Sequence, residues 1–179
     1  LAALRYKNLN IRKLFGKSVF IAGGGEPAFS LVSSLLTVNS KKQADIAVFL
    51  LVSDYERYDR RFDFINSSDF AIVKYSSPDS INKSGDILIE TGFLLSDKVE
   101  STDVFKSNIS RAENIISVIK VLKIKEFVVL SDASAYGKLE KELEKRFKDT
   151  ADPTTDEYGW ISWVTGEVIS DYYTAEQLK

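Results

Sequence analysis

The chain has 179 residues, of which 44% are hydrophobic and 12% aromatic, which is enough apolar material for one domain with a sizeable core. Lys and Arg number 24 against 26 Asp and Glu, and the resulting net charge of −2 argues against a broad affinity for nucleic acid or an anionic membrane. Cys and His are both absent, which excludes disulfides, thiolate catalysis, Cys or His metal ligands and a Ser-His-Asp triad.

The sequence has no apolar run of about 18 residues, so we expect no transmembrane helix. Residues 1–5 also differ from the basic-then-apolar pattern of a secretory signal peptide. A cytoplasmic location is therefore expected. Met is absent and the first residue is Leu1, so we expect a shortened chain.

Strand-like apolar runs alternate with helical patterns along most of the chain. A first run at residues 18–22 is followed by three glycines and by a helical spacing of apolar residues over 27–38. The further strand-like runs lie at residues 44–52, 69–75, 86–89 and 125–130, and a second helical pattern lies at 103–122. Continuous apolar runs indicate strands buried on both faces, and alternation with helices indicates βαβ units. We predict an α/β fold: a Rossmann-like, doubly wound parallel sheet with helices on both faces.

The last part of the chain is more polar. Residues 137–147 predict a charged helix and residues 148–157 a polar loop, with a further strand at 159–164 and a helix at 166–179. We therefore divide the chain into a Rossmann-like nucleotide-binding-type domain, residues 1–148, and a short C-terminal extension, residues 149–179.

A glycine turn, Gly23, Gly24 and Gly25, is the first candidate site. Glycines between a strand and a helix let backbone N–H groups approach a phosphate at the helix N-terminus, where the helix dipole favours an anion. The pattern Gly23-x-Gly25-x-x-Ala28 fits a dinucleotide fingerprint, and Asp54, after the second strand, is the candidate acceptor for a ribose hydroxyl.

The same turn has a second interpretation. Pro27 suits the first position of a helix and Glu26 suits its first turn, so the segment is also a good strand–turn–helix without any ligand. In that case the Glu26 carboxylate fills the anion site itself and would repel a pyrophosphate. Both interpretations stay open.

The second candidate is residues 131–137, SDASAYG, at the end of the fifth predicted strand. Ligands of open α/β sheets lie beyond the carboxyl ends of the strands, and this segment gathers hydroxyls and a carboxylate there. The alternative is a helix cap, in which Asp132 or Ser134 bonds the first free amides of the following helix.

Several segments, taken in order, resemble the NAD-dependent epimerase/dehydratase family, the extended short-chain dehydrogenase/reductases that act on nucleotide sugars. The matching segments are residues 8–10, 16–23, 86–89, 108–116 and 123–137, and the likeness covers roughly residues 8–140. It implies NAD or NADP as cofactor and a nucleotide sugar as substrate, allows a homodimer, and implies no nucleic-acid or membrane partner.

The resemblance also implies site residues. It adds Asn108 to the cofactor-binding candidates that the glycine turn and the second strand already provide, which are Gly23, Gly24, Gly25, Ala28 and Asp54, although the Gly25 and Ala28 spacing is not that of the family. The catalytic candidates are Ser131, Asp132, Tyr136 and Lys138. In the family a Tyr removes a sugar hydroxyl proton, a Lys four residues later lowers the pKa of that Tyr, and a Ser or Thr binds the same oxygen. No metal is implied.

Several positions depart from the family pattern. Its second and third glycines fall on Glu26 and Phe29, and Phe29 would push the helix away from the sheet. The small residues expected after the fourth strand are replaced by Glu90-Thr91-Gly92, and the family's Gly-Thr pair by Arg111-Ala112.

The catalytic positions depart as well. Asp132 takes the Ser/Thr place, and no Tyr of this chain has Lys at the fourth following position. We therefore expect a degenerate or truncated member: an NAD(P)-dependent nucleotide-sugar epimerase/dehydratase-like protein with impaired catalysis. The alternative is a non-catalytic Rossmann-like domain that acts in assembly or regulation.

Overall fold

A computed structural model of the chain describes residues 11–52, 60–76, 78, 81, 84–91 and 101–130. Two α-helices and five strands make up most of this part, together with two short 3-10 helices. In chain order the elements are η2 (Ile11–Leu14), β1 (Ser18–Ala22), α1 (Glu26–Lys42), β2 (Ala47–Val52), η4 (Arg60–Phe64), β3 (Phe70–Lys74), β4 (Ile87–Glu90), α2 (Ser101–Leu122) and β5 (Glu126–Val129).

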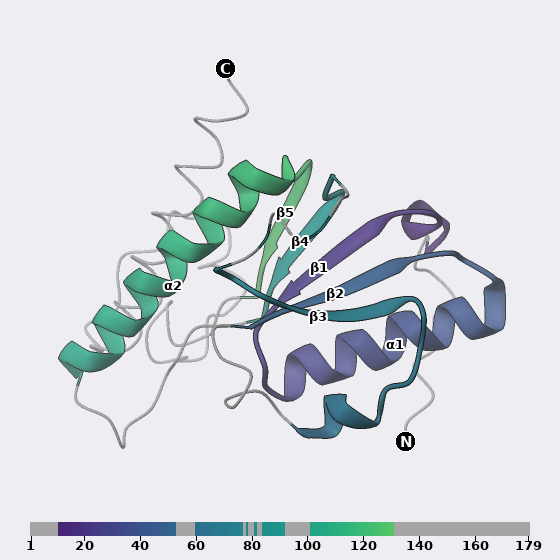
Figure 1. Ribbon diagram of the computed structural model, residues 1–179, viewed down its shortest axis with the longest axis horizontal. Coiled ribbons are helices and arrows are strands. Elements are labelled where there is room, and N and C mark those ends of the chain that lie inside the picture. Colours follow the sequence, from purple (N-terminus) through teal and green to yellow (C-terminus); the bar gives the residue numbers. More distant parts are fainter. Residues whose placement is uncertain are drawn as a thin grey trace, which may run out of the picture.

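The five strands form one parallel sheet in the order β3-β2-β1-β4-β5 (Figure 1). In the centre Phe20 of β1 lies opposite Phe49 of β2 on one side and Leu88 of β4 on the other. β1 is therefore the point at which the strand order reverses: the chain first builds outward through β2 and β3, then crosses back to place β4 on the other side of β1.

Two apolar cores cover the two faces of the sheet, because successive side chains of a strand point to opposite faces. Val19 and Ile21 of β1 pack with α1, whereas Phe20 and Ala22 pack with α2. All five residues of β1 are buried, as expected for a central strand covered on both sides. The predicted doubly wound α/β fold is confirmed for the described residues.

Both helices present one apolar stripe to the sheet. On α1 the buried positions are Ala28, Val32, Leu35 and Asn39, and on α2 they are Val104, Asn108, Ala112, Ile115, Val118, Ile119 and Leu122. These spacings of three and four residues place each set on a single helix face. α1 continues beyond the predicted residue 38 and ends where Gln43, in a left-handed conformation (φ 51°), donates its N–H to the Asn39 carbonyl.

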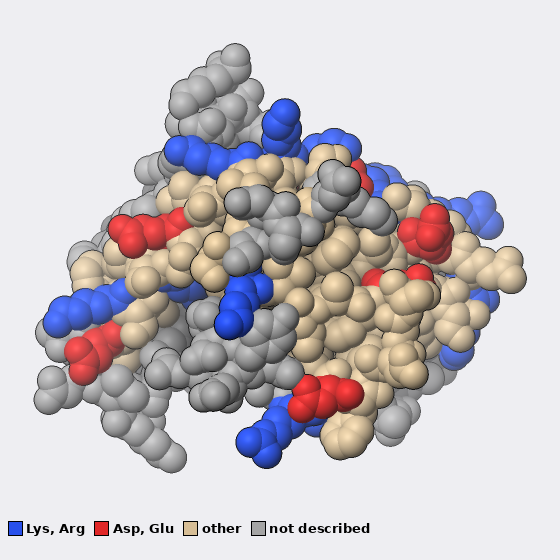
Figure 2. Space-filling model, viewed as in Figure 1, with Lys and Arg blue, Asp and Glu red and all other residues tan. Residues whose placement is uncertain are grey.

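No described helix is both long and apolar enough to cross a membrane. On the face shown in Figure 2, Lys and Arg side chains are interspersed with Asp and Glu over a largely uncharged surface. The predicted elements after residue 130, and the predicted domain boundary at residue 148, lie outside the described residues.

Candidate nucleotide site at the carboxyl edge of the sheet

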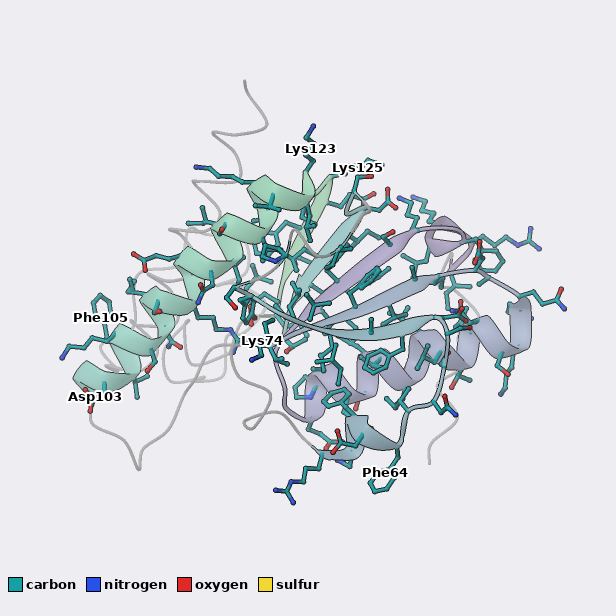
Figure 3. The ribbon with its side chains drawn as sticks, viewed as in Figure 1. Phe64, Lys74, Asp103, Phe105, Lys123 and Lys125 are labelled. Carbon is teal, nitrogen blue, oxygen red and sulfur yellow. The ribbon has the colours of Figure 1, made fainter. Side chains whose placement is uncertain are left out.

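The reversal of strand order between β1 and β4 defines the place where a ligand would be expected. In open α/β sheets the crevice outside the carboxyl ends of the strands, at such a reversal, is the usual binding site. Here β1 ends at Ala22 and β4 at Glu90, and these two residues are paired in register. Lys74 ends the edge strand β3, and Figure 3 shows it beside the same carboxyl edge.

The glycine turn lies at this edge, directly after β1. Gly23 is buried and has φ +127°, a conformation that L side chains rarely adopt, and its N–H donates to the Leu51 carbonyl of β2. Gly25 is exposed and is the N-cap residue of α1, so no side chain of its own caps the helix. Among the described residues, a side chain added at Gly25 would meet only Pro27 Cδ, at an ordinary 3.8 Å, so these residues leave the turn open on this side.

Glu26 does not fill the anion site in the way that the second interpretation of the turn requires. Its carboxylate accepts a hydrogen bond from the Arg61 guanidinium of η4 and forms an ion pair with it, with both side chains exposed. Arg61 also lies over the Phe29 ring, 4.5 Å from its centroid. The negative charge at the mouth of the turn is therefore partly offset by a neighbouring cation.

Ala28, and not Phe29, makes the close contact between α1 and the sheet. Ala28 is fully buried in the core that contains Val19 and Ile21 of β1. Phe29 is half-buried and packs edge-on against Phe62 of η4, with ring centroids 5.5 Å apart. The expectation that Phe29 pushes the helix away is thus corrected: its ring points toward η4, and the small side chain next to it faces β1.

The opposite side of the turn is filled by the chain itself. The Ala22 carbonyl accepts hydrogen bonds from Thr91 N at 3.0 Å, Thr91 Oγ1 at 2.7 Å and Arg111 Nη2 at 3.2 Å. A side chain at Gly23 would overlap Thr91 Oγ1 and approach Arg111 Nη2 to 3.0 Å. Thr91 and Arg111 therefore cover the β1–β4 junction on the β4 side.

Arg111 belongs to a buried polar cluster at this junction. Glu90 is completely buried at the end of β4, and its Oε1 lies 2.5 Å from Arg111 Nη2. Tyr75, directly after β3, is 6% exposed and belongs to the same core. Burial raises the pKa of the Tyr75 hydroxyl, Arg111 opposes that rise and Glu90 adds to it. Tyr75 thus stays protonated at neutral pH and is no substitute for a catalytic Tyr of lowered pKa.

The structure describes some of the predicted site residues and not others. Gly23, Gly24, Gly25 and Ala28 lie together at the turn, and Asn108 is fully buried on α2. Asp54, Ser131, Asp132, Tyr136 and Lys138 lie outside the described residues, so their roles stay predictions. Within the described ranges, no three acidic, Cys or His side chains are grouped as a metal site.

Sequence reasoning marked Glu90, Thr91 and Arg111 only as separate departures from a family pattern. It did not show that two of these residues are in contact: the carboxylate at the end of β4 pairs with the guanidinium on α2. The signal that could have found them is the opposite charge of two residues that replace small or neutral ones at two predicted sheet-edge positions.

Solved structures of a dehydratase and of two epimerases share this architecture. A dTDP-glucose 4,6-dehydratase from Bacillus anthracis in complex with NAD matches with a TM-score of 0.65 and 14% identity, over 90% of this chain and 52% of that chain. The UDP-Glc/GlcNAc 4-epimerase of Campylobacter jejuni matches with a TM-score of 0.66 and 15% identity, over 89% and 50%. An epimerase from Methanothermobacter thermautotrophicus matches with a TM-score of 0.68 and 15% identity, over 91% and 49%.

The fold is that of epimerases and dehydratases of this kind. The predicted resemblance is thereby confirmed at the level of the fold. This chain spans about half the length of the structures that it matches. No protein-family model matches the sequence, and no curated protein matches it.

Proposed function

We propose that this chain is the nucleotide-binding-type domain of an NAD(P)-dependent nucleotide-sugar epimerase/dehydratase-like protein that binds nucleotide weakly and lacks the hydride-transfer reaction. One observation carries the proposal: an open glycine turn leads into α1 at the reversal point of a parallel sheet. Backbone amides at such a helix start suit a phosphate. The likeness to solved enzymes supports the ligand class by analogy of fold.

NAD(P) fits this edge only in part. The side of the turn at Gly25 leaves room for a phosphate to approach the backbone, whereas the side at Gly23 is occupied by Thr91 and Arg111. Glu26 places a carboxylate in the first turn of α1, and its ion pair with Arg61 offsets the repulsion without removing it. These residues support weak binding.

The residues of this chain also support the absence of turnover. When bound, a nicotinamide dinucleotide would supply the hydride acceptor. The partner step needs a group to remove a hydroxyl proton, and no Tyr here is followed by Lys at the fourth position. Tyr75 is buried and protonated, so it does not supply the missing base.

Isothermal titration calorimetry with ADP and with NAD tests the binding. We expect dissociation constants of about 0.1 mM or weaker for both ligands. Glu26→Gln should tighten ADP about threefold, because it removes a carboxylate that repels the phosphates from the first turn of α1. Asp45→Asn, in the loop before β2 at the opposite edge of the sheet, is the matched control and should leave the affinity unchanged.

A micromolar dissociation constant for NAD would contradict the weak binding, and unchanged or weaker affinity in Glu26→Gln would contradict the assignment of Glu26. For turnover, a UDP-sugar is incubated with protein and NAD while NADH absorbance is followed. No reduction is expected, and stoichiometric reduction of the NAD would overturn this part of the proposal.

A non-catalytic role in assembly or regulation is the second candidate. The observation that favours it is the hydrogen bonding of Thr91 and Arg111 to the Ala22 carbonyl, which satisfies the end of β1 without any ligand. Absence of ADP binding, together with a change in sedimentation coefficient on adding a partner protein, would favour this candidate over the first.

A further inference from the structure

The two sides of the glycine turn differ in a way that bears on which nucleotide fits. In a doubly wound sheet the pyrophosphate lies at the start of the first helix, and one nucleoside extends toward the second strand. The other nucleoside of a dinucleotide must then cross the reversal point toward β4. We therefore ask separately whether a ligand has room at the start of α1 and whether it has room on the β4 side.

At the start of α1, the described residues leave the approach to Gly25 open. A side chain built at Gly25 meets nothing closer than 3.8 Å, and Gly25, Glu26 and Pro27 are all exposed. Because Gly25 has no side chain, the described residues leave room for a phosphate to reach the backbone here, against the remaining repulsion of Glu26.

On the β4 side, the space that Gly23 would leave for a ligand is already occupied. Thr91 Oγ1 and Arg111 Nη2 both donate to the Ala22 carbonyl, and both stand where a side chain at Gly23 would lie. These are fixed groups: Arg111 Nη2 is also bonded to Glu90 Oε1 at 2.5 Å, and Glu90 is completely buried.

Moving the guanidinium aside would be unfavourable. It would break the ion pair and leave the Glu90 carboxylate buried without its cation, which is costly in a low-dielectric interior. The Ala22 carbonyl would lose a donor at the same time. A ligand that needs this space must therefore supply the free energy of breaking the pair.

We infer that Thr91 and Arg111 are specificity-determining residues that restrict the crevice to a mononucleotide such as ADP, by filling the β4 half that the second nucleoside of a dinucleotide would need. This rests on the proposed function, because it presupposes that nucleotide binds at the glycine turn. The quantity that it predicts is the ratio of the NAD and ADP association constants. In this chain the second nucleoside of NAD gains no contacts, so the ratio is about one or below.

Calorimetric titration of the full chain and two double variants with ADP and NAD tests the inference. The opening variant is Glu90→Leu with Arg111→Ala, which removes the charges together and shortens the side chain at position 111. The matched control is Glu90→Leu with Arg111→Met, which removes the same charges but keeps a long side chain in place. Circular dichroism first establishes that each variant is folded.

We expect the NAD-to-ADP ratio to rise about tenfold in the opening variant and to stay near one in the natural chain and the Met control. An NAD affinity at least tenfold above that for ADP in the natural chain would overturn the inference, as would an unchanged ratio in a folded opening variant. An equal rise in the Met control would also overturn it, because the charge and not the volume would then be responsible.

Thr91→Ala covers the case in which the double variants do not fold. It leaves the Glu90–Arg111 pair intact and empties part of the same space, and we expect the ratio to rise about threefold. No rise in this variant contradicts the inference. If the natural chain does not bind ADP at all, the proposed function is overturned as well. If it binds ADP but binds NAD at least tenfold more tightly, only the restriction is overturned.

Discussion

At position 23, both the backbone conformation and the neighbouring side chains require glycine. Its φ of +127° is unfavourable for any residue with a Cβ, and the volume beside it is filled by Thr91 and Arg111. Gly25, two residues later, has φ −94° and an open surrounding. The two glycines therefore meet different requirements. Gly23 is needed for its backbone conformation and its close packing, whereas Gly25 leaves the backbone accessible.

Gly23→Ala should lower the free energy of unfolding by about 2 kcal/mol or more, because the backbone must change and Thr91 must move. Gly25→Ala is the control, with an expected effect below about 1 kcal/mol. Urea denaturation followed by circular dichroism measures both. Equal effects of the two substitutions would show that the close contact at Gly23 is not important.

Asp86 connects three elements at the amino end of the sheet. Its carboxylate accepts hydrogen bonds from Lys125 Nζ at 2.6 Å and from the Ser18 backbone N–H at 2.9 Å. The Lys125 hydrogen bond, followed by that of Ser18, lowers the pKa of Asp86 below its ordinary value of 3.8. Figure 3 shows Lys125 at the end of the sheet away from Lys74, so this pair lies far from the candidate site.

The lowered pKa predicts a pH dependence of stability. The unfolded chain binds this proton more readily than the folded one, so the contribution of Asp86 is fully present above about pH 4 and is lost as the pH falls through the folded-state pKa. Asp86→Asn should therefore flatten the decline in melting temperature in acid. Thermal unfolding at a series of pH values measures this, and a parallel decline in both proteins would contradict it.

At the scale of elements, Asn39 connects the end of α1 to the start of β2. It is buried, its amide donates to the Ile46 carbonyl at 2.7 Å and to Asp69 at 3.0 Å, and its carbonyl accepts from Ile46 N at 2.9 Å. A polar residue thus takes a position on the apolar stripe of the helix, because the loop before β2 needs partners for its backbone groups.

Asn39→Ala should destabilise the protein by about 2–4 kcal/mol, since it leaves two backbone groups of Ile46 buried without partners. Thr37→Ala is the control on the same helix. The Thr37 hydroxyl is exposed and only bonds back to the Ser33 carbonyl, so its loss should cost less than about 0.5 kcal/mol. Chemical denaturation that shows no difference between the two variants would refute this role of Asn39.

The strands and helices themselves follow closely from local pattern. The predicted first strand, residues 18–22, has the observed bounds, and the other predicted strands differ from β2, β3, β4 and β5 by only a few residues at their ends. The end of α1 is the larger difference, because Asn39 is a polar residue whose burial depends on Ile46 and Asp69. A contact with a separate element is invisible to helical periodicity.

At the scale of the whole molecule, the Glu90–Arg111 pair joins strand β4, which lies between β1 and β5, to α2 at the carboxyl edge. Arg111→Ala alone should cost about 3–5 kcal/mol of stability, because it removes the cation that pairs with a completely buried carboxylate. Glu90→Leu combined with Arg111→Met should recover most of this loss, since no charge then stays buried. A double-mutant cycle by urea denaturation measures the coupling, and additive single effects would contradict it.

One part of the candidate site was predictable from the sequence, and another part was not. Gly23, Gly25 and Ala28 are close in the chain, and their spacing alone predicted a turn between a strand and a helix at which a phosphate fits. The pairing of Glu26 with Arg61 was not predictable, because the two residues are 35 positions apart and η4 meets α1 only in the tertiary structure.

The sequence by itself determined the alternation of strands and helices, and with it the doubly wound class, because burial on one or two faces leaves a periodic trace within each segment. Only the tertiary structure decided that Ala22, Tyr75, Glu90 and Arg111 converge on one junction. They come from four separate elements, and their meeting depends on the order of strands across the sheet. That order is set by the packing of the whole chain, and no local pattern encodes it.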